Sequence, residues 1–369
     1  MSFIDVVEQY EDFDVDGFLG QVTDRDVERA LAKEKMEPMD FLALLSPTAA
    51  GHLEPMAQKA RRLTVQYFGR TIQLFIPLYI SNYCSNQCLY CGFNRTHAIE
   101  RKTLTLEEIE CEAQAIASTG MQHLLLLTGE SLQATPMDYL EAAVRLLKRY
   151  FASVSIEIFP LDKADYRRLK TAGADGLTLY QETYDRSVYR QVHLAGRKAD
   201  YRNRLDAPER GARAGFRAVN IGPLVGLGEK RHDVFMCGLH ARYLDDRFLE
   251  TEIGLSLPRI NPAEGGYQPA HPADDRAFVQ FLLALRLFMP RSALTVSTRE
   301  RAGFRDRLIH LGVTRLSAGS CTGVGGYARP AERKTAQFEI SDQRSVAQVA
   351  QAIAAQGYQP VYKDWDLIA

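Results

Sequence analysis

The sequence has almost no net charge, no long apolar run and no basic leader, and each absence excludes a class of protein. Its 45 Lys and Arg residues nearly balance 46 Asp and Glu residues, for a formal net charge of -1. Binding to nucleic acid or to an anionic membrane through overall charge needs a basic excess, so we expect neither partner. The acidic N-terminal stretch "MSFIDVVEQYEDFDVDGF" lacks the apolar core of a signal peptide, and no run of 18 apolar residues follows. We therefore expect a cytoplasmic protein whose cysteines stay reduced.

Cysteine is scarce, yet half of it is concentrated in one short segment. Only six cysteines occur in 369 residues, and Cys84, Cys88 and Cys91 all fall within "CSNQCLYC". A disulfide is disfavoured in a reducing compartment, and a structural zinc site normally needs a fourth ligand that no nearby Cys or His pair supplies. Thiolates also select iron-sulfur clusters, and three of them on a four-iron cluster leave one iron free for another ligand. The spacing therefore favours a cluster over zinc or a disulfide.

Strand-like and helix-like patterns alternate from about residue 71 onward. Eight such pairs favour an α/β fold of the closed (β/α)₈ type, with an open doubly wound sheet as the alternative. We expect an N-terminal helical extension over 1–70, the barrel over 71–320, and a C-terminal loop, last helix and tail over 321–369. The predicted strands are 71–81, 123–130, 154–160, 176–182, 218–226, 251–260, 293–300 and 313–320.

Polar residues end most of the predicted strands. In a barrel of this type the active site lies at the carboxyl ends of the strands, so these residues would converge on one face. For each residue taken alone, the alternative is that its polar side chain simply contacts solvent at the end of a strand and has no further role. They are Thr128, Gly129 and Glu130 after the second strand, Glu157 on the third, Glu182 after the fourth, the glycine-rich "GPLVGLGE" after the fifth, then Arg259, Arg299 and Ser317.

Several motifs together resemble a known family. The cysteine motif "CSNQCLYCGFNR" after the first strand is similar to the signature of the radical S-adenosylmethionine (SAM) enzymes. The segments "LLLLTGES", "YQETYDRSVY", "STRERAGFRD", "LSAGSCTGVGGY" and the ending "GYQPVYKDWD" narrow the resemblance to the tyrosine lyases of thiazole formation. The resemblance implies a [4Fe-4S] cluster on Cys84, Cys88 and Cys91, with SAM on the free iron and a 5′-deoxyadenosyl radical as the reactive species.

The resemblance also implies which residues contact SAM. Gly129 and Glu130 match a family segment beside the methionyl amino group, although Thr128 replaces its first glycine. Contacts to the ribose and the methionyl carboxylate are implied for Glu182 and Arg204, for which an ion pair at the surface is the alternative. The same resemblance adds Phe93 and Val225 to the cofactor-binding residues.

The implied reaction is cleavage of the Cα–Cβ bond of L-tyrosine to 2-iminoacetate (dehydroglycine) and p-cresol, for the thiazole of thiamine. Arg299 and Ser317 would hold the substrate carboxylate, Ser320 is a second hydroxyl, and Tyr90 would lie near the reacting group. Arginine suits a carboxylate because its planar fork donates two parallel hydrogen bonds. Arg301 is close enough in sequence to exchange roles with Arg299.

Alternative functions stay open from sequence. The tail "QPVYKDWD" is the main feature that distinguishes this sequence from a tryptophan lyase. A hydrogenase maturase would carry a second cysteine cluster, whereas no cysteine follows Cys321. Sulfur insertion would need further cluster ligands, and a zinc-stabilised scaffold would have no activity. For partners, the resemblance implies thiazole synthase and an electron donor such as flavodoxin or ferredoxin.

The remaining cysteines and the histidines are expected to be structural. Cys111 and Cys237 fall within predicted helices and read as small core residues. His193, without a partner motif in the sequence, reads as structural or solvated.

Overall fold

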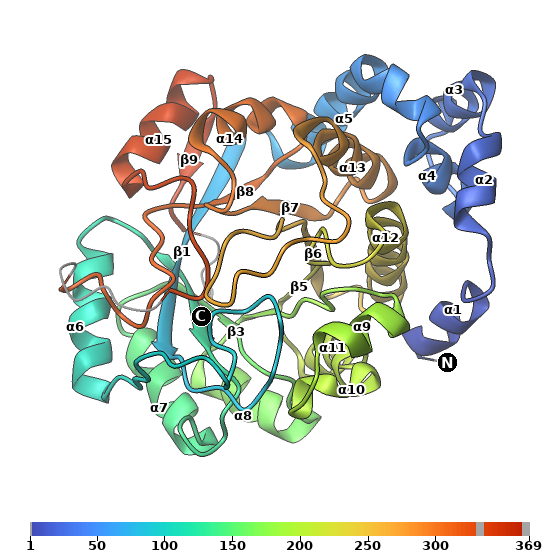
Figure 1. Ribbon diagram of the computed structural model, residues 1–369. Helices are drawn as coiled ribbons and strands as arrows, with labels where there is room; N and C mark the ends of the chain where they lie inside the picture. Colours follow the sequence, from blue (N-terminus) through green and yellow to red (C-terminus); the bar gives the residue numbers. More distant parts are fainter. Residues whose placement is uncertain (1, 330–335, 364–369) are drawn as a thin grey trace.

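The computed structural model describes residues 2–329 and 336–363, and at its centre lies a closed barrel of eight parallel strands (Figure 1). Successive strands pair side by side, and β1 pairs with both β2 and β8, which closes the ring. The predicted (β/α)₈ barrel is therefore confirmed, and an open sheet is excluded. The strands are β1 (Thr71–Ser81), β2 (His123–Thr128), β3 (Ser153–Glu157), β4 (Gly176–Thr178), β5 (Ala218–Ile221), β6 (Glu252–Ser256), β7 (Ala293–Val296) and β8 (Arg315–Ser317).

Helices surround the barrel on its outer face (Figure 1). The start of α6 is a capping box, because Glu108 N–H donates to the Thr105 hydroxyl while the Glu108 carboxylate accepts from Thr105 N–H. The helices are α6 (Leu106–Ala117), α7 (Met137–Leu147), α8 (Lys163–Ala172), α9 (Arg186–Val192), η2 (Arg197–Ala199), α10 (Tyr201–Leu205), α11 (Ala207–Ala214), α12 (Lys230–Arg247), α13 (Asp275–Phe288), α14 (Ala302–Leu308), η3 (Ile309–Leu311) and α15 (Val346–Ala355).

The N-terminal segment is helical and packs outside the barrel, as predicted. The Phe3 ring stacks on His240 of α12 at 4.1 Å, and the Phe41 ring stacks on Phe288 of α13 at 4.4 Å. These contacts fasten the extension to the barrel helices, while its boundary near residue 70 stays a prediction. The elements are α1 (Phe3–Gln9), α2 (Val15–Gln21), α3 (Asp24–Ala32), α4 (Pro38–Leu44), η1 (Thr48–His52) and α5 (Leu53–Phe68).

Several predicted strands are too long. Strands β5 to β8 end three to five residues before their predicted ends, because the chain leaves the ladder there to form the loops that carry the polar residues. Two features were not predicted at all. Helices α9 and α10 lie in the connection between β4 and α11, and a ninth strand, β9 (Gln359–Val361), pairs with the first three residues of β1. The final residues of the tail motif, from 364 onward, lie outside the described residues.

A segment after β8 crosses back over the barrel and is fixed to α6. The buried Glu112 carboxylate accepts hydrogen bonds from the backbone N–H groups of Gly326 (3.2 Å), Tyr327 (2.7 Å) and Ala328 (3.2 Å). A carboxylate that accepts from several N–H groups forms strong, charge-assisted hydrogen bonds. Gly325 N–H also donates to the Tyr79 carbonyl at 2.9 Å, so residues 325–328 run beside β1.

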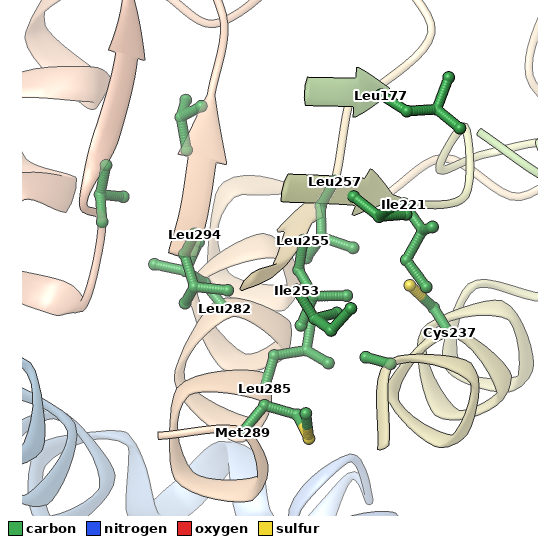
Figure 2. Packing of buried hydrophobic residues seen from close by; sticks show 14 of the residues in the cluster. Leu177, Ile221, Cys237, Ile253, Leu255, Leu257, Leu282, Leu285, Met289 and Leu294 are labelled. Atoms are coloured by element: carbon green, nitrogen blue, oxygen red, sulfur yellow. The ribbon is translucent and has the colours of Figure 1, made fainter. Parts of the chain in front are cut away.

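The hydrophobic core lies between the strands and their helices. Figure 2 shows Leu255 and Ile253 of β6 facing Leu282 and Leu285 of α13, with Cys237 of α12 close by. Burial of Cys237 was predicted and is confirmed, but the same prediction for Cys111 is wrong, because Cys111 falls on the exposed face of α6. Across residues 2–329 and 336–363, no helix combines the length and apolar composition needed to cross a bilayer.

Candidate active site at the barrel mouth

The three clustered cysteines lie in the loop after β1, at the carboxyl end of the barrel strands. Arg101 fixes this loop, since its guanidinium donates to the carbonyl oxygens of Asn82 (2.6 Å), Phe93 (2.9 Å) and Asn94 (2.6 Å). Three bonds from one planar group restrain both ends of the loop. The cysteine backbone is thus held in place by the protein itself.

The chemistry of the three thiols suits an iron-sulfur cluster. Burial raises the pKa of the Cys88 thiol to about 12 and raises that of Cys91, where the neighbouring Cys84 adds to the effect. Adjacent buried thiols lose their protons together only when positive charge joins them. Within the described ranges, no three His, Cys, Asp or Glu side chains converge on a point that would hold a single metal ion. A four-iron cluster takes its thiolates at separate corners, so the donor set fits a cluster and not the zinc site considered above.

Gln337, from the segment after β8, connects the cysteine loop with the barrel interior. Its amide nitrogen lies 3.6 Å from Cys91 Sγ, and its amide oxygen accepts from the Tyr79 hydroxyl at 2.7 Å. The backbone carbonyl of Gln337 accepts from Gly92 N–H at 3.0 Å. Gln337 was not predicted as a site residue, and no local motif could have indicated it, because the contact spans 246 positions.

The loop after β2 packs directly on the cysteine loop. A side chain at Gly129 would meet the Tyr83 carbonyl oxygen at 2.3 Å, so only glycine fits. The next residue, Glu130, is buried, and its carboxylate accepts from the Asn86 amide at 2.6 Å. The structure thus places both predicted SAM contacts against the cysteines, and their role toward SAM stays a prediction.

Glu182, after β4, is the centre of a buried cluster of charges. Its carboxylate accepts from Lys198 Nζ at 2.6 Å and from Arg204 Nη2 at 3.2 Å. Burial alone would raise the pKa of the Glu182 carboxyl, but Lys198 and then Arg204 bring it below the ordinary value. Among the described non-glycine residues, Glu182 alone has a positive φ, of 73°, and such strain gathers at functional sites. The surface ion pair considered above is therefore wrong, and Lys198 is a third member that the sequence did not suggest.

The other two predicted cofactor residues are more deeply buried. The Phe93 ring is 1% exposed and lies edge-on to Tyr79 at 5.8 Å. The Val225 side chain is 2% exposed, and its backbone N–H donates to the Pro258 carbonyl at 2.8 Å. Both residues shape the mouth of the barrel in this structure, and direct contact with SAM stays a prediction for each.

Tyr90, between two of the cysteines, is held by a histidine. Its hydroxyl lies 2.7 Å from His193 Nε2, and His193 Nδ1 lies 2.8 Å from the Tyr189 carbonyl oxygen. Burial lowers the pKa of His193 to about 3, so the imidazole is neutral. The carbonyl requires the proton on Nδ1, which leaves Nε2 to accept from Tyr90. His193, expected to be structural or solvated, therefore positions a predicted site residue.

A pocket inside the barrel collects three of the four predicted substrate residues, whereas Tyr90 packs beside Leu224 and Leu227 and is not among the residues that line it. Arg299, Ser317 and Ser320 line it together with Glu157. Ser320 Oγ is buried and, in the part of the chain that the structure describes, has no hydrogen-bond partner. The exposed area of the wall is largely apolar and includes Phe75, Pro77, Leu125, Leu127, Leu257 and Phe338, while Tyr79, Tyr180, Glu300 and several Ser and Thr residues add polar atoms.

Arg299 and Arg301 differ clearly in environment. Arg299 lines the pocket, where its guanidinium lies 3.2 Å from the centre of the Phe338 ring, and it forms no ion pair with any described residue. Arg301 has a side chain that is 71% exposed and pairs with Asp275 at 2.6 Å. Of the two candidates, the structure thus brings only Arg299 into the pocket. Arg259, another predicted strand-end residue, is already neutralised by ion pairs with Glu300 and Asp275.

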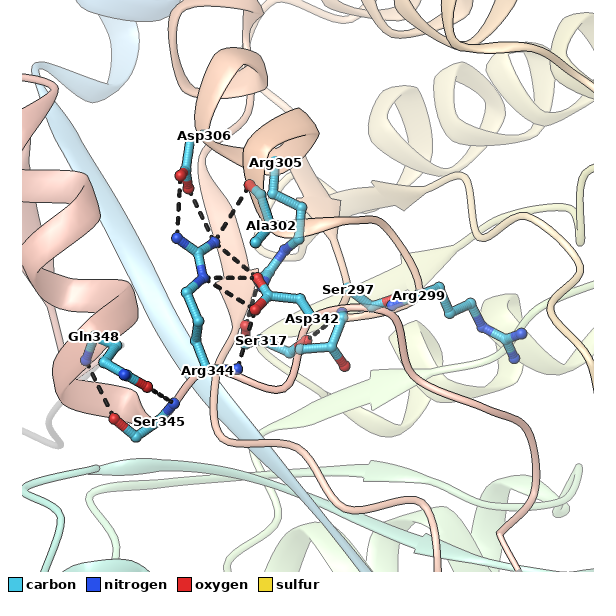
Figure 3. A network of polar contacts seen from close by, with 11 residues as sticks. Ser297, Arg299, Ala302, Arg305, Asp306, Ser317, Asp342, Arg344, Ser345 and Gln348 are labelled. Atoms are coloured by element: carbon cyan, nitrogen blue, oxygen red, sulfur yellow. Dashed lines mark hydrogen bonds and ion pairs between the residues drawn. The ribbon is translucent and has the colours of Figure 1, made fainter.

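Ser317 is held by a buried network that joins three elements. Its hydroxyl accepts from Thr298 N–H at 3.0 Å, and its carbonyl accepts from Arg305 of α14. Arg305 also forms an ion pair with Asp342, in which both side chains are 0% exposed. Figure 3 shows this network with Arg344 on its outer side, and Arg299 extending away from it. The Ser317 hydroxyl thus supports the backbone beside Arg299.

Comparisons with known proteins agree with this geometry. A model of the radical SAM superfamily matches residues 78–236, and one of the Biotin and Thiamin Synthesis associated domain matches residues 256–359. The 2-iminoacetate synthase of Salmonella typhimurium is 42% identical over 366 residues, which cover 99% of this chain and 97% of the relative. The 2-iminoacetate synthase of Escherichia coli is 44% identical over 345 residues, which cover 93% of this chain and 91% of the relative.

A solved structure agrees with these sequence relatives. The FeFe-hydrogenase maturase HydG from Carboxydothermus hydrogenoformans matches with a TM-score of 0.83 at 29% identity, covering 98% of this chain and 82% of that one. The resemblance inferred from the motifs is confirmed, and with it the use of a [4Fe-4S] cluster and SAM. The chain belongs to the radical SAM superfamily and, within it, to the family of the 2-iminoacetate synthases.

Proposed function

We propose that this protein is a radical SAM lyase that cleaves the Cα–Cβ bond of L-tyrosine, giving 2-iminoacetate and p-cresol for the thiazole of thiamine. When bound, the cluster and SAM supply a 5′-deoxyadenosyl radical, and the protein positions the substrate for it. One observation carries the proposal beyond family membership. The half-buried Arg299 lines a largely apolar pocket beneath the cysteine loop and, among the described residues, forms no ion pair. An aromatic amino acid would supply a carboxylate for Arg299 and a ring for the apolar part of the pocket.

In this proposal Arg299 binds the substrate carboxylate through its two parallel N–H groups. The Phe338 ring covers one face of the guanidinium, with 3.2 Å between Cζ and the ring centre, while the carboxylate would bind in the plane of the guanidinium. The Ser320 hydroxyl then donates to the same carboxylate, which gives this buried group its partner. Ser317 fixes the backbone beside them through Thr298 N–H.

Two further groups complete the assignment. Tyr90, fixed by neutral His193, lies between the cysteines and orients the substrate amino group. Gly129, Glu130, Glu182 and Arg204 would hold SAM beside the free iron, and Phe93 and Val225 shape its surroundings. Glu182 keeps its negative charge because Lys198 and Arg204 flank it.

The test is anaerobic reconstitution with iron, sulfide, a reductant, SAM and L-tyrosine, followed by chromatography for p-cresol. Wild-type protein should form p-cresol, and Arg299→Ala should lose most of the activity because the carboxylate loses its partner. Arg301→Ala is the matched control, because the Arg301 side chain is exposed and its removal should change p-cresol formation little. Cleavage of tryptophan without any p-cresol would contradict the substrate while leaving the reaction class intact.

The maturase relationship suggests a second candidate, assembly of a hydrogenase cofactor. It is favoured only by the structural match to the maturase. Iron and sulfide analysis separates the two, because a second cluster would double the iron content. A single cluster per chain supports the lyase.

The proposed partners follow from the chemistry of the product. Dehydroglycine hydrolyses readily in water, so direct transfer to a thiazole synthase is expected. Electrons would come from a flavodoxin or a ferredoxin, and neither nucleic acid nor a membrane is proposed. We place the protein in the cytoplasm because the six cysteines are free thiols. Anaerobic co-purification with thiazole synthase tests the complex, and its consistent failure across tags and salt would count against it.

A further inference from the structure

Glu157 is a charged residue in the pocket to which the proposed reaction gives no role. It is the last residue of β3 and lines the same cavity as Arg299. Within residues 2–329 and 336–363 its side chain forms neither a hydrogen bond nor an ion pair, although it lies close enough to Tyr79 and Tyr180 to raise their pKa values. A carboxyl group in a largely apolar pocket is costly unless something pairs with it. Such a group is a candidate ligand for substrate.

The barrel places Glu157 opposite Arg299. In the closed ring, four steps lead from β3 to β7 through β4, β5 and β6, and four lead the other way through β2, β1 and β8. Arg299 follows β7, so the acid and the base project from opposite walls. The wall between them includes the apolar side chains of Phe75, Leu125 and Leu127. The pocket therefore carries a charged side chain on each of two facing sides, with apolar side chains and a few hydroxyl groups, among them those of Tyr79 and Tyr180, between them.

We propose that the Glu157 carboxylate accepts a hydrogen bond from the phenol hydroxyl of the substrate and thereby selects tyrosine over phenylalanine. This inference rests on the proposed function. A substrate whose carboxylate sits on Arg299 carries its amino group on the adjacent carbon, on the same side of the pocket. Only the far end of the side chain reaches the opposite wall. A site built to bond a hydroxyl rejects the analogue that lacks it, because the protein group is then left buried and unpaired.

The surroundings of Glu157 set how this selection depends on pH. Burial and, after it, the charge of Glu182 raise the pKa of the Glu157 carboxyl to about 7, while Arg299, Arg204 and Lys198 limit the rise. Tyr79 of β1 and Tyr180 after β4 also face it, and β2 contributes only Leu125 and Leu127 here. As the pH falls through 7 the carboxylate becomes protonated and its charge-assisted bond weakens. The preference for tyrosine should therefore be stronger at pH 8 than at pH 6.

The experiment measures dissociation constants and KM values for L-tyrosine and L-phenylalanine with the reconstituted protein between about pH 6 and pH 8. Glu157→Leu should weaken tyrosine binding by about 10- to 100-fold, the range for a hydrogen bond to a charged group, and should strengthen phenylalanine binding, because no carboxylate is then left unpaired beside the ring. Glu157→Gln keeps an oxygen acceptor, so it should restore part of the preference but remove its pH dependence. Glu28→Leu, on the exposed face of α3, is the matched control.

The outcomes are distinct. Equal weakening of tyrosine and phenylalanine by Glu157→Leu would overturn the inference, because Glu157 would then bind a group that both amino acids share. Unchanged tyrosine binding in both variants would overturn it as well. If wild-type protein neither binds tyrosine nor forms p-cresol, the proposed function itself fails. Circular dichroism of each variant shows whether the fold is retained, and Glu157→Gln, which changes one atom, remains informative if Glu157→Leu does not fold.

Discussion

At the scale of single residues, Gln337 joins two parts of the site that lie far apart in sequence. Its amide nitrogen faces Cys91 Sγ while its amide oxygen accepts from the hydroxyl of Tyr79, which lines the pocket inside the barrel. Hydrogen bonds to the sulfur ligands of an iron-sulfur cluster help to set its reduction potential. A donor stabilises the extra negative charge of the reduced cluster, so this contact should favour reduction.

We therefore expect Gln337→Leu to shift the midpoint potential of the cluster to a more negative value. Redox titration followed by electron paramagnetic resonance measures this potential independently of turnover. Gln58→Leu, on the exposed face of α5, should leave the potential unchanged. An identical potential in Gln337→Leu and wild-type protein would show that the amide does not act on Cys91.

At the scale of elements, a buried ion pair fastens the segment after β8 to α14. Arg305 and Asp342 are both fully buried, and Arg305 also donates to the Ser317 carbonyl at the end of β8. The backbone N–H of Asp342 donates to the Thr298 carbonyl at 3.1 Å, one residue before Arg299. One pair thus holds together the two loops that carry the predicted carboxylate site (Figure 3).

Asp342→Asn should lower the free energy of unfolding by about 3 to 5 kcal/mol, because it leaves Arg305 buried without a counter-charge. Denaturation in urea measures this change. Asp245→Asn is the control, since it removes a pair with Arg291, whose side chain is 69% exposed, and should cost about 1 kcal/mol or less. Similar losses of unfolding free energy in both variants would mean that the buried ion pair between Arg305 and Asp342 contributes no more to stability than an exposed pair does.

At the scale of the whole molecule, the sequence predicted the parts of the fold that depend on local pattern. Strand and helix alternation predicted the barrel, and the spacing of Cys84, Cys88 and Cys91 predicted the cluster loop. Contacts between distant segments were not accessible in the same way. The pairing of β9 with β1 and the Gln337 contact with Cys91 depend on tertiary packing, which no short window records.

The site residues show the same division. Glu157 and Arg299 were both recognised as strand-end residues, but their opposition across the pocket follows only from closure of the ring. Likewise, Cys111 was expected in the core because it lies in a helix, whereas the face on which it falls is set by how α6 packs. A helical pattern with few strong hydrophobic residues does not fix that face.

The stability of the whole chain should depend on pH through the buried Asp233 of α12. Its side chain is 0% exposed, and Oδ1 accepts from Thr183 Oγ1 (2.9 Å) and Tyr184 N–H (2.7 Å). Oδ2 has no hydrogen-bond partner among the described residues. Burial raises the pKa of the Asp233 carboxyl to about 7, whereas an unfolded aspartate titrates near 3.8. Between these values the folded chain holds a proton that the unfolded chain has lost.

Asp233 should thus contribute stability that is fully present below about pH 4 and is lost as the pH rises through about 7. Asp233→Asn keeps an oxygen acceptor for Thr183 and Tyr184 without any charge at either pH. The difference in free energy of unfolding, variant minus wild type, should therefore rise steadily from about pH 4 to pH 7 and then level off. Taking this difference cancels the titration of His193 and His240, whose pKa values are lowered by burial and act in the opposite direction. A difference that stays constant across that range would mean that Asp233 is ionised in the folded protein throughout, and that α12 is joined to the Glu182 loop by a charged contact.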